Sequence, residues 1–499
     1  MRTLRLAVLL WVAPVLAGAQ AEKRPNVLWI CADDHAAYVT ACYGNKIVRT
    51  PNIDRLAAGG VRFDRAYCAS PVCTASRQAF LTGRYPRSIG VTQLSTPLPE
   101  SELTLAEMLR DAGYETAAIG KMHFNSDLRH GFNVRADSPE HRKWLAAKPR
   151  AAVPNGVEVL GPWKPFKDPA HVWLNARALP RAMDADMDAT YFAGRAAEFL
   201  SGARERPFFL MVSFTQPHSP FNFPVEFAGK YQARQFSAPA VDPSDDSRIP
   251  EVFRDLTDEQ KRGIAAAYYT AIEYVDSKVG QVLDALERSG QADNTLVIYT
   301  GDHGYMLGQH GRFEKHCGYE PAIRAPLIIR PPGAARAGGA SPALVNLIDV
   351  VPTVLDAAGV RVPANVQGRS LTTVLREPAT HHRDGVFVEY SENEEAYLVT
   401  ERWKFIYGTG KRLRQDGYET GSPPPGRTVM LFDLKGDPEE RINLAGRPEH
   451  AERVAGFTSQ LADHMKATAR QPELVPQTDD PHAILEHCLQ PRDVEARPR

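Results

Sequence analysis

The 499-residue sequence has few cysteines, no excess of charge of either sign, and no repeat or low-complexity tract. Six scattered cysteines exclude a small disulfide-held scaffold, although one or two bridges are compatible with their number. A formal net charge of −1 gives no reason to expect nucleic acid or an anionic membrane surface as a partner. Because 43% of the residues are hydrophobic, the chain can bury the core of a large globular protein.

The chain also lacks long apolar runs, apart from one close to its N-terminus. Two arginines precede an apolar stretch over 6–16, which Ala17-Gly18-Ala19 follows with the pattern of a cleavage site. This order is typical of a secretion signal, and the stretch is too short to span a bilayer comfortably. We therefore predict a signal peptide over 1–19, a secreted or periplasmic protein, and no integral membrane segment in the mature chain.

Four short apolar runs predict strands of a buried sheet, because they are continuous rather than alternating. The runs span 26–32, 116–119, 207–214 and 295–299. Amphipathic stretches that begin after Thr104 and Thr257 carry capping-box sequences and predict helices between the strands. This alternation predicts an α/β fold with a large, doubly wound, mixed but mostly parallel sheet flanked by helices.

Each predicted strand ends in polar residues that can carry chemistry. These residues are Asp33 and Asp34, Lys121 and His123, His218, and Asp302 and His303. Ligands of open α/β sheets bind at the carboxyl ends of the strands, so we expect these side chains to converge. The carboxylates suit a hard divalent cation, and Arg77, Lys121 and Lys315 would add positive charge for a tetrahedral oxyanion ester. The imidazoles of His123 and His218 suit proton transfer.

Taken singly, these residues also fit ordinary structural roles. Paired aspartates at 33–34 and the Asp-His-Gly sequence at 302–304 are typical of turns. Cys73 alone is more typical of a small buried side chain than of a nucleophile. The common location predicted for four strand ends is what favours a functional site.

The segment around Cys73 is more specific. Residues 73–77 read Cys-Thr-Ala-Ser-Arg, and Leu-Thr-Gly-Arg follows at 81–84. This resembles the signature of the type I, formylglycine-dependent sulfatases of the alkaline phosphatase superfamily, in which Ala75 replaces a commoner proline. Other family landmarks occur in order, and the resemblance covers about residues 25–465. Gly120–Phe124 and His303 are similar to choline-sulfatase-like members, and His303 also to iduronate-sulfatase-like members.

The resemblance implies hydrolysis of a sulfate ester by a nucleophile made from Cys73. In this family a formylglycine-generating enzyme oxidises the cysteine to formylglycine (3-oxoalanine), whose hydrate attacks sulfur. The implied ligands of Ca²⁺, with Mg²⁺ as the alternative ion, are Asp33, Asp34, Asp302, His303 and the modified Cys73. The implied contacts of the hydrate and the sulfate are Arg77 for the hydrate, and Lys121, His123, His218 and Lys315 for the sulfate. His316, beside Lys315, is a further candidate substrate contact.

The identity of the substrate is less well defined by the sequence. The secretion signal favours a sulfated glycan over a sulfated small molecule, and an insertion over 125–183 carries Trp144, Trp163 and Trp173. These rings are suited to stacking on sugars or to anchoring a solvated loop. Two alternatives remain: a phosphonate or phosphate monoester hydrolase of the same superfamily, and a catalytically silent carbohydrate-binding protein with unmodified Cys73.

We predict three parts after the signal peptide. The catalytic α/β domain spans 20–375, and a small C-terminal α+β domain with an antiparallel sheet spans 376–470. The segment 471–499 is rich in proline and charge, which predicts an extended tail that wraps over the body or a partner subunit, or is disordered. Through this tail the chain could form an oligomer.

Overall fold

The computed structural model describes residues 24–157, 183–333, 338–414 and 417–494. The predicted signal peptide, together with Trp163 and Trp173, lies outside the described residues. Within the described ranges, none of the helices combines the length and the apolar character that a membrane crossing requires.

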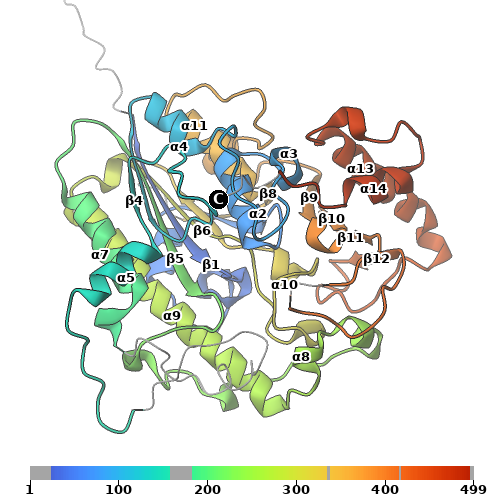
Figure 1. The fold of residues 1–499 in the computed structure, drawn as a ribbon, viewed down its shortest axis with the longest axis horizontal. Helices are drawn as coiled ribbons and strands as arrows, with labels where there is room; N and C mark the ends of the chain where they lie inside the picture. The colour runs from blue at the N-terminus through green and yellow to red at the C-terminus, as the bar shows by residue number, and fades with distance from the viewer. Residues whose placement is uncertain (1–23, 158–182, 334–337, 415–416, 495–499) are drawn as a thin grey trace, which may run out of the picture.

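A mixed sheet of eight strands forms the centre of the larger part of the molecule (Figure 1). In spatial order the strands are β4 (Val134–Ala136), β3 (Glu115–Gly120), β5 (Phe208–Pro217), β1 (Asn26–Asp33), β6 (Thr295–Gly301), β7 (Leu327–Arg330), β2 (Val61–Tyr67) and β8 (Gly339–Asn346). Strand β7 is antiparallel to both neighbours, and the other neighbouring pairs are parallel. The predicted fold class is therefore confirmed.

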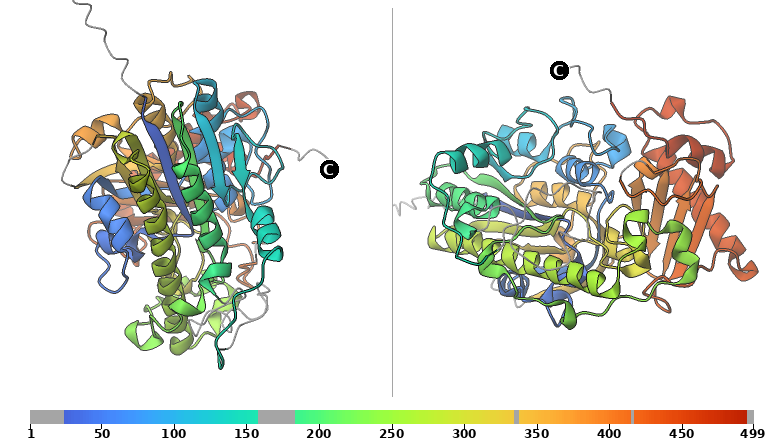
Figure 2. Two further views of the ribbon diagram at one scale, coloured as in Figure 1. Left: turned by 90° about the vertical axis from the view of Figure 1, so that its left-hand side faces the viewer. Right: turned by 60° about the horizontal axis from the view of Figure 1, so that its bottom comes forward.

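Helices cover both faces of this sheet (Figure 2), because alternate residues of each buried strand point to opposite sides. Val27 and Trp29 of β1 join one apolar cluster, and Leu28 and Ile30 join the other. The first cluster includes residues of α2 (Cys73–Thr82), α4 (Leu105–Asp111) and α11 (Val350–Ala357). The second includes residues of α1 (Pro51–Ala58), α7 (Asp188–Ser201) and α9 (Asp258–Arg288). The capping boxes predicted at the starts of α4 and α9 are both formed.

Shorter helices connect these elements. They are α3 (Pro86–Ile89), α5 (Ser138–Ala146), α8 (Glu251–Arg254), α10 (Glu320–Ile323) and α12 (Thr372–Arg376). All six cysteines are free in the structure, so the one or two bridges that their number allows are not formed.

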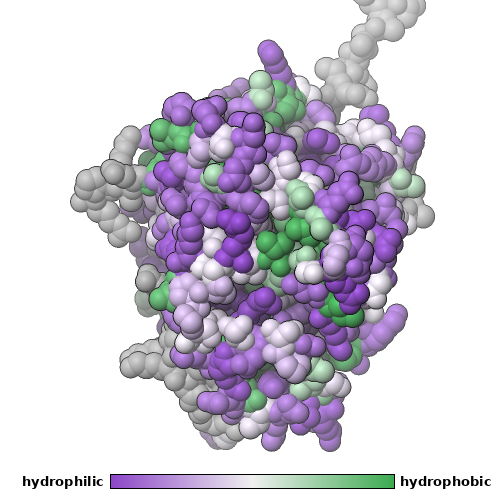
Figure 3. Space-filling view, turned by 90° about the vertical axis from the view of Figure 1, so that its right-hand side faces the viewer, coloured by the Kyte–Doolittle hydropathy of each residue, from purple (hydrophilic) through white to green (hydrophobic). Residues whose placement is uncertain are grey.

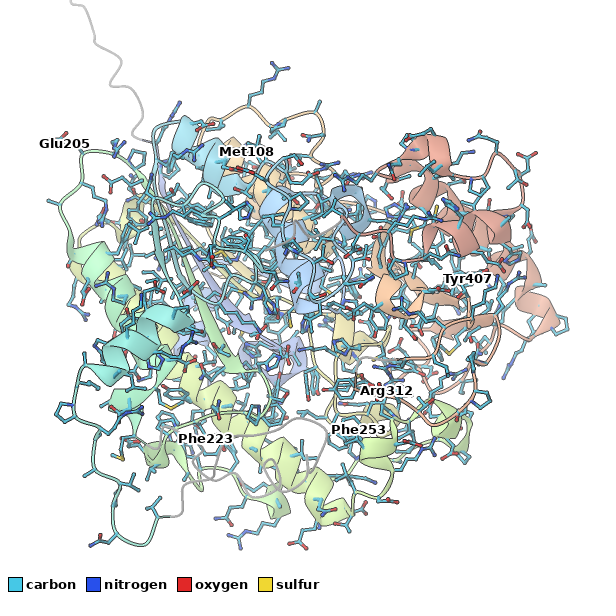
Figure 4. All side chains as sticks on the ribbon, viewed as in Figure 1. Met108, Glu205, Phe223, Phe253, Arg312 and Tyr407 are labelled. Atoms are coloured by element: carbon cyan, nitrogen blue, oxygen red, sulfur yellow. The ribbon has the colours of Figure 1, made fainter. Side chains whose placement is uncertain are left out.

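A second, antiparallel sheet of four strands lies beside the first (Figures 1 and 2). Its order is β12 (Thr428–Asp433), β11 (Trp403–Gly408), β10 (Glu395–Thr400) and β9 (Gly385–Tyr390). Helices α13 (Ala451–Ala467) and α14 (Pro481–Cys488) share an apolar cluster with this sheet. Tyr407 of β11, labelled in Figure 4, stacks on His482 of α14 with 5.8 Å between ring centroids.

Of the alternatives for the segment after residue 470, packing over the body agrees with its described residues, whereas an extended or disordered tail does not, because the segment contains helix α14. Leu485 and Cys488 are fully buried in the cluster between α14 and the small sheet, and this apolar contact stabilises the helix.

The face of the molecule that carries the small sheet and its helices is mostly hydrophilic, with a few hydrophobic residues gathered near its middle (Figure 3). An oligomer formed through the tail stays a prediction.

Candidate active site

Four neighbouring parallel strands bring the predicted site residues to one edge of the large sheet. Because β3, β5, β1 and β6 are adjacent and parallel, their carboxyl ends lie together. The residues at these ends are Lys121 after β3, His218 after β5, Asp33 and Asp34 at the end of β1, and Asp302 and His303 after β6. Helix α2 brings Cys73 and Arg77 to the same edge.

Arg77 connects three of these strand ends. Its side chain is fully buried, and its Nε donates to Asp302 Oδ2 at 2.9 Å while Nη2 donates to Asp33 Oδ1 at 3.0 Å. Nη1 donates to the carbonyl oxygen of Lys121 at 2.8 Å and to Ser213 Oγ at 2.7 Å. The fixed fork of the guanidinium therefore sets the orientation of both carboxylates.

Cys73 is the first residue of α2, and 1% of its surface is exposed. Its Sγ lies 3.2 Å from His303 Nε2, 3.2 Å from Lys315 Nζ and 3.7 Å from Asp34 Oδ1. Burial, and then the negative charge of Asp33, raise the pKa of the thiol well above its ordinary value in spite of Lys315. An unmodified Cys73 is therefore a protonated thiol at neutral pH and a poor nucleophile.

Two of the aspartates are held ionised by cations. Lys315 Nζ donates to Asp34 Oδ1 at 2.7 Å and to Oδ2 at 3.0 Å, and Lys121 Nζ pairs with Asp33 Oδ2. Burial alone would raise the pKa of Asp34, but positive charge, from His218 in its protonated form and from Lys315, lowers it to about 2. Burial is likewise outweighed at Asp33, where Lys121 and Arg77 lower the pKa well below its usual range.

The hydrogen bonds of two histidines define which ring nitrogen carries the proton. Nδ1 of His303 lies 2.9 Å from the carbonyl oxygen of Gly304, and Nδ1 of His218 lies 2.7 Å from that of Ser219. A carbonyl oxygen only accepts, so Nδ1 is the protonated nitrogen in both rings. Burial lowers the pKa of both histidines, for His218 to about 4. Both rings are therefore neutral at neutral pH and present Nε2 as an acceptor.

The donor set fits a divalent cation. His303 Nε2 faces Asp34 Oδ1 at 3.5 Å and Asp302 Oδ2 at 3.7 Å, so three acceptors converge at a point where a cation would be stabilised in addition to Lys315 and Arg77. Ligand atoms within 4.8 Å of one another form two overlapping groups: Asp33, Asp34, Cys73 and His218, and Cys73, Asp302 and His303. The residues that could hold the ion are therefore those that the sequence predicted, with His218 beside them.

Two further residues predicted for the site, His123 and His316, have surroundings that differ from those of the metal-binding candidates. Burial, and then Lys121, lower the pKa of His123 to about 2, and its Nδ1 has no hydrogen-bond partner among the described residues. The ring of His316 is buried and packs on Tyr390 and Tyr418, with centroid distances of 5.9 and 5.4 Å. Its contact with substrate stays a prediction.

Trp144, in the insertion at residues 125–183, is on α5. It packs on Tyr191 of α7, with 5.1 Å between ring centroids, and Lys148 Nζ lies 4.1 Å from its ring. These contacts agree with the alternative of an aromatic anchor.

The sequence reasoning missed three polar residues that support the site. Ser213 accepts a hydrogen bond from Arg77, and as a polar residue inside the apolar run of β5 it carried a usable signal. The amide of Gln78 donates to the carbonyl oxygen of His123 at 3.0 Å, and the amide of Asn125 donates to that of Leu94 at 2.8 Å. No local pattern distinguishes these two amides from surface side chains.

Family models match most of the described chain. The sulfatase family model matches residues 25–360, and the model of the C-terminal part of N-sulphoglucosamine sulphohydrolase matches residues 308–467. An N-acetylglucosamine-6-O-sulfatase from Bacteroides thetaiotaomicron is 27% identical over 89% of this chain and 87% of its own length. A choline-sulfatase from Rhizobium meliloti is 30% identical over 85% of this chain and 83% of its own length.

Solved structures show the same fold. A phosphonate monoester hydrolase from Agrobacterium radiobacter is 25% identical, with a TM-score of 0.75 over 91% of this chain and 98% of that one. A protein solved in complex with its substrate D-glucosamine-2-N,6-O-disulfate is 23% identical, with a TM-score of 0.71 over 92% of this chain and 99% of that one. The sulfatase family model matches two thirds of this chain. The chain therefore belongs to the sulfatase family, whose members hydrolyse sulfate esters.

Proposed function

We propose that this protein hydrolyses the sulfate ester of a sulfated carbohydrate, with a formylglycine made from Cys73 and a Ca²⁺ ion bound by Asp33, Asp34, Asp302 and His303. The observation that carries the proposal is the position of Cys73 Sγ, 3.2 Å from both His303 Nε2 and Lys315 Nζ at the edge where the aspartates meet. The name of the N-acetylglucosamine-6-O-sulfatase relative supports a carbohydrate substrate. The secreted or periplasmic location predicted from residues 1–19 agrees with a glycan outside the cell.

The modified residue and the metal would supply chemistry that the chain lacks. A formylglycine hydrate at position 73 would supply one hydroxyl to attack sulfur and a second, on the same carbon, that allows sulfate to be expelled. Ca²⁺ beside it would add positive charge that makes a hydroxyl more acidic and compensates charge on the sulfate oxygens. The host must therefore provide a formylglycine-generating enzyme.

The chain's own cations would bind and orient the sulfate group. Three carboxylates, Asp33, Asp34 and Asp302, are balanced in this cluster by Arg77, Lys121 and Lys315. A bound dication would thus leave the site with net positive charge toward an anionic ester. Arg77 would keep the reacting carbon and the strand ends in place, while Lys121 and Lys315 would contact sulfate oxygens.

Lys315 and His218 are the two candidates for the group that protonates the leaving oxygen. Burial opposes the charge of Lys315, but Asp34 raises its pKa well above its ordinary value, so it carries its proton at neutral pH. Neutral His218 offers an acceptor at Nε2 and would first have to bind a proton. We therefore assign the proton transfer to Lys315 and keep His123 as the candidate that accepts a proton as sulfate leaves, although burial and Lys121, which lower its pKa to about 2, make it a weak base in this structure.

The chemical state of Cys73 tests this proposal directly. Trypsin releases the peptide Ala66–Arg77, which contains both Cys68 and Cys73. We expect thiol alkylation to label this peptide once, at Cys68, and the mass to show the sulfur and two hydrogens of Cys73 replaced by one oxygen. Two labels on all of the secreted protein, together with no turnover of 4-nitrophenyl sulfate, would instead favour a silent carbohydrate-binding protein.

A phosphonate or phosphate monoester hydrolase is the second candidate, because a phosphonate monoester hydrolase shares the fold with a TM-score of 0.75. The ratio of kcat/KM for 4-nitrophenyl sulfate to that for the corresponding aryl phosphonate and phosphate separates the two. We expect the sulfate to be the better substrate. A higher kcat/KM for the aryl phosphonate would instead identify the protein as a phosphonate monoester hydrolase.

A further inference from the structure

The last described residues of the chain contact a loop beside the candidate active site. After α14 the described backbone runs back to α3 (Figure 1), where Val494 N donates to the carbonyl oxygen of Gly90 at 3.0 Å. Residues 490–494 are here called the strap, and residues 91–98, between α3 and α4, the rim loop. The strap and the rim loop are about four hundred positions apart in the sequence, and hydrogen bonds join them.

One carboxylate makes most of this connection. Asp493 Oδ1 accepts a hydrogen bond from Thr92 N at 2.9 Å, and Oδ2 accepts one from Gln93 N at 3.0 Å. The hydroxyls of Thr92 and Thr96 also donate to the two oxygens. All four partners are donors, so only a group with two acceptor oxygens satisfies them together, and a carboxylate makes the strongest such bonds.

The rim loop in turn holds the residues next to Cys73 and His123. Thr74 Oγ1 donates to the carbonyl oxygen of Leu94 at 2.6 Å. Asn125 Nδ2 donates to the carbonyl oxygens of Leu94 and Thr96 at 2.8 and 3.0 Å. Gln78 Nε2 donates both to Thr96 O at 3.2 Å and to His123 O at 3.0 Å. The loop therefore links the first turn of α2 to the turn that carries His123.

We propose that Asp493 is a positioning residue for the reaction at residue 73: the strap fixes the rim loop, and the rim loop fixes the start of α2 relative to His123. This proposal rests on the proposed function, because its kinetic test measures turnover at this site. A second carboxylate, Glu392, accepts from Leu94 N at 2.5 Å, so the rim loop is not held by the strap alone. Loss of Asp493 should accordingly loosen the loop without unfolding the protein.

Hydrogen exchange tests the structural step without any substrate. In Asp493→Ala we expect faster exchange of the amides of the rim loop and of residues 121–126 than in the wild type. The matched control is Glu486→Ala, which removes a carboxylate of α14 that pairs with Lys411 and Arg427 and does not contact the rim loop in the described structure. Unchanged exchange in Asp493→Ala would overturn the proposal.

Kinetics tests the functional step. We expect Asp493→Ala to lower kcat for 4-nitrophenyl sulfate about tenfold, with a smaller change in KM, because misplaced reacting groups cost rate more than binding. Asp493→Asn keeps one acceptor oxygen and should recover part of kcat. Rates are divided by the fraction of formylglycine found in the peptide Ala66–Arg77, so that incomplete conversion is not read as slow catalysis.

Two further arms keep the outcomes distinct. Thr96→Val removes a single hydroxyl donor to Asp493 and should lower kcat in the same direction by a smaller factor, and it replaces Asp493→Ala if that variant does not fold. If the wild type hydrolyses only the aryl phosphonate, the proposed function has failed, and the same kcat comparison is made with that substrate. A kcat within about twofold of the wild type in Asp493→Ala, despite faster exchange, would show that the strap does not position the reacting groups.

Discussion

Two buried clusters of charged side chains in this molecule are built in different ways. At the edge of the large sheet, the neutral Nε2 of His303 and carboxylate oxygens of Asp34 and Asp302 face one another as acceptors. Where β11 of the small sheet meets α10, the ammonium of Lys404 lies 2.8 Å from Glu320 Oε1, 3.0 Å from Glu440 Oε1 and 3.0 Å from the carbonyl oxygen of Gly318.

The second cluster is closed. Lys404 donates to Gly318 O and Glu440 Oε1 and forms an ion pair with Glu320, Glu320 N donates to Glu440 Oε2 at 2.7 Å, and Tyr67 OH donates to Glu320 Oε2 at 3.1 Å. The first cluster is also paired with Lys315 and Arg77, but three of its acceptors converge around His303 Nε2, where an added cation would be stabilised. The comparison teaches that buried charge alone does not identify a metal site. Buried acceptors that converge on one another are what indicates such a site.

The largest effect on catalysis is expected from the open cluster. Asp34→Asn removes one negative ligand, and we expect kcat to fall by a factor on the order of 10³ together with the loss of thermal stabilisation by Ca²⁺. The measurements are 4-nitrophenyl sulfate turnover and melting curves of both proteins after EDTA and after added Ca²⁺. Equal stabilisation of the variant and the wild type by Ca²⁺ would place the ion elsewhere.

A smaller, substrate-dependent effect is expected from the proton donor. Lys315→Met should slow an alkyl sulfate by a factor on the order of 10² more than it slows 4-nitrophenyl sulfate, because a good leaving group needs no proton. His218→Asn, the matched variant, should slow both esters by similar factors. If the dependence on the leaving group appears in His218→Asn instead, the roles assigned to the two residues must be exchanged.

The closed cluster should affect stability and leave catalysis nearly unchanged. Lys404→Met leaves two buried carboxylates without their cation, so we expect the free energy of unfolding to fall by about 3–5 kcal/mol. The kcat of the folded protein should stay within about threefold of the wild type. Urea unfolding measures the first quantity, with Lys411→Met as an exposed-pair control that should change it by less than about 1 kcal/mol. A large loss of kcat in Lys404→Met would remove the distinction between the clusters.

The parts of the fold that could be predicted were those with a strong local pattern. The continuous apolar runs of β1, β3, β5 and β6 located four strands, and the parallel arrangement then predicted where their polar ends would meet. Strand β2 was missed because charged and polar residues interrupt its run, and β4 because it has three residues. Helix α14 was missed because proline and charge dominate the composition of its surroundings, while a few buried side chains stabilise it.

The supporting contacts of the site were beyond local patterns. Arg77 was predicted from its place in the motif, but its bonds to Asp33, Asp302 and Ser213 depend on how three strands and a helix pack. Asp493 lies in a segment whose composition predicted an extended tail over the body or a partner subunit, or disorder, and indicated no particular contact. Its hydrogen bonds to the rim loop follow from the path of the chain after α14, which no spacing in the sequence encodes.

The most direct measurement is a diffraction structure of the converted enzyme with bound Ca²⁺. The account predicts a single ion about 2.3–2.6 Å from carboxylate oxygens of Asp33, Asp34 and Asp302, with the ammonium of Lys315 withdrawn from one or both oxygens of Asp34. The account would be contradicted by a structure at saturating calcium in which this edge of the sheet holds no ion and Lys315 still bonds both oxygens of Asp34.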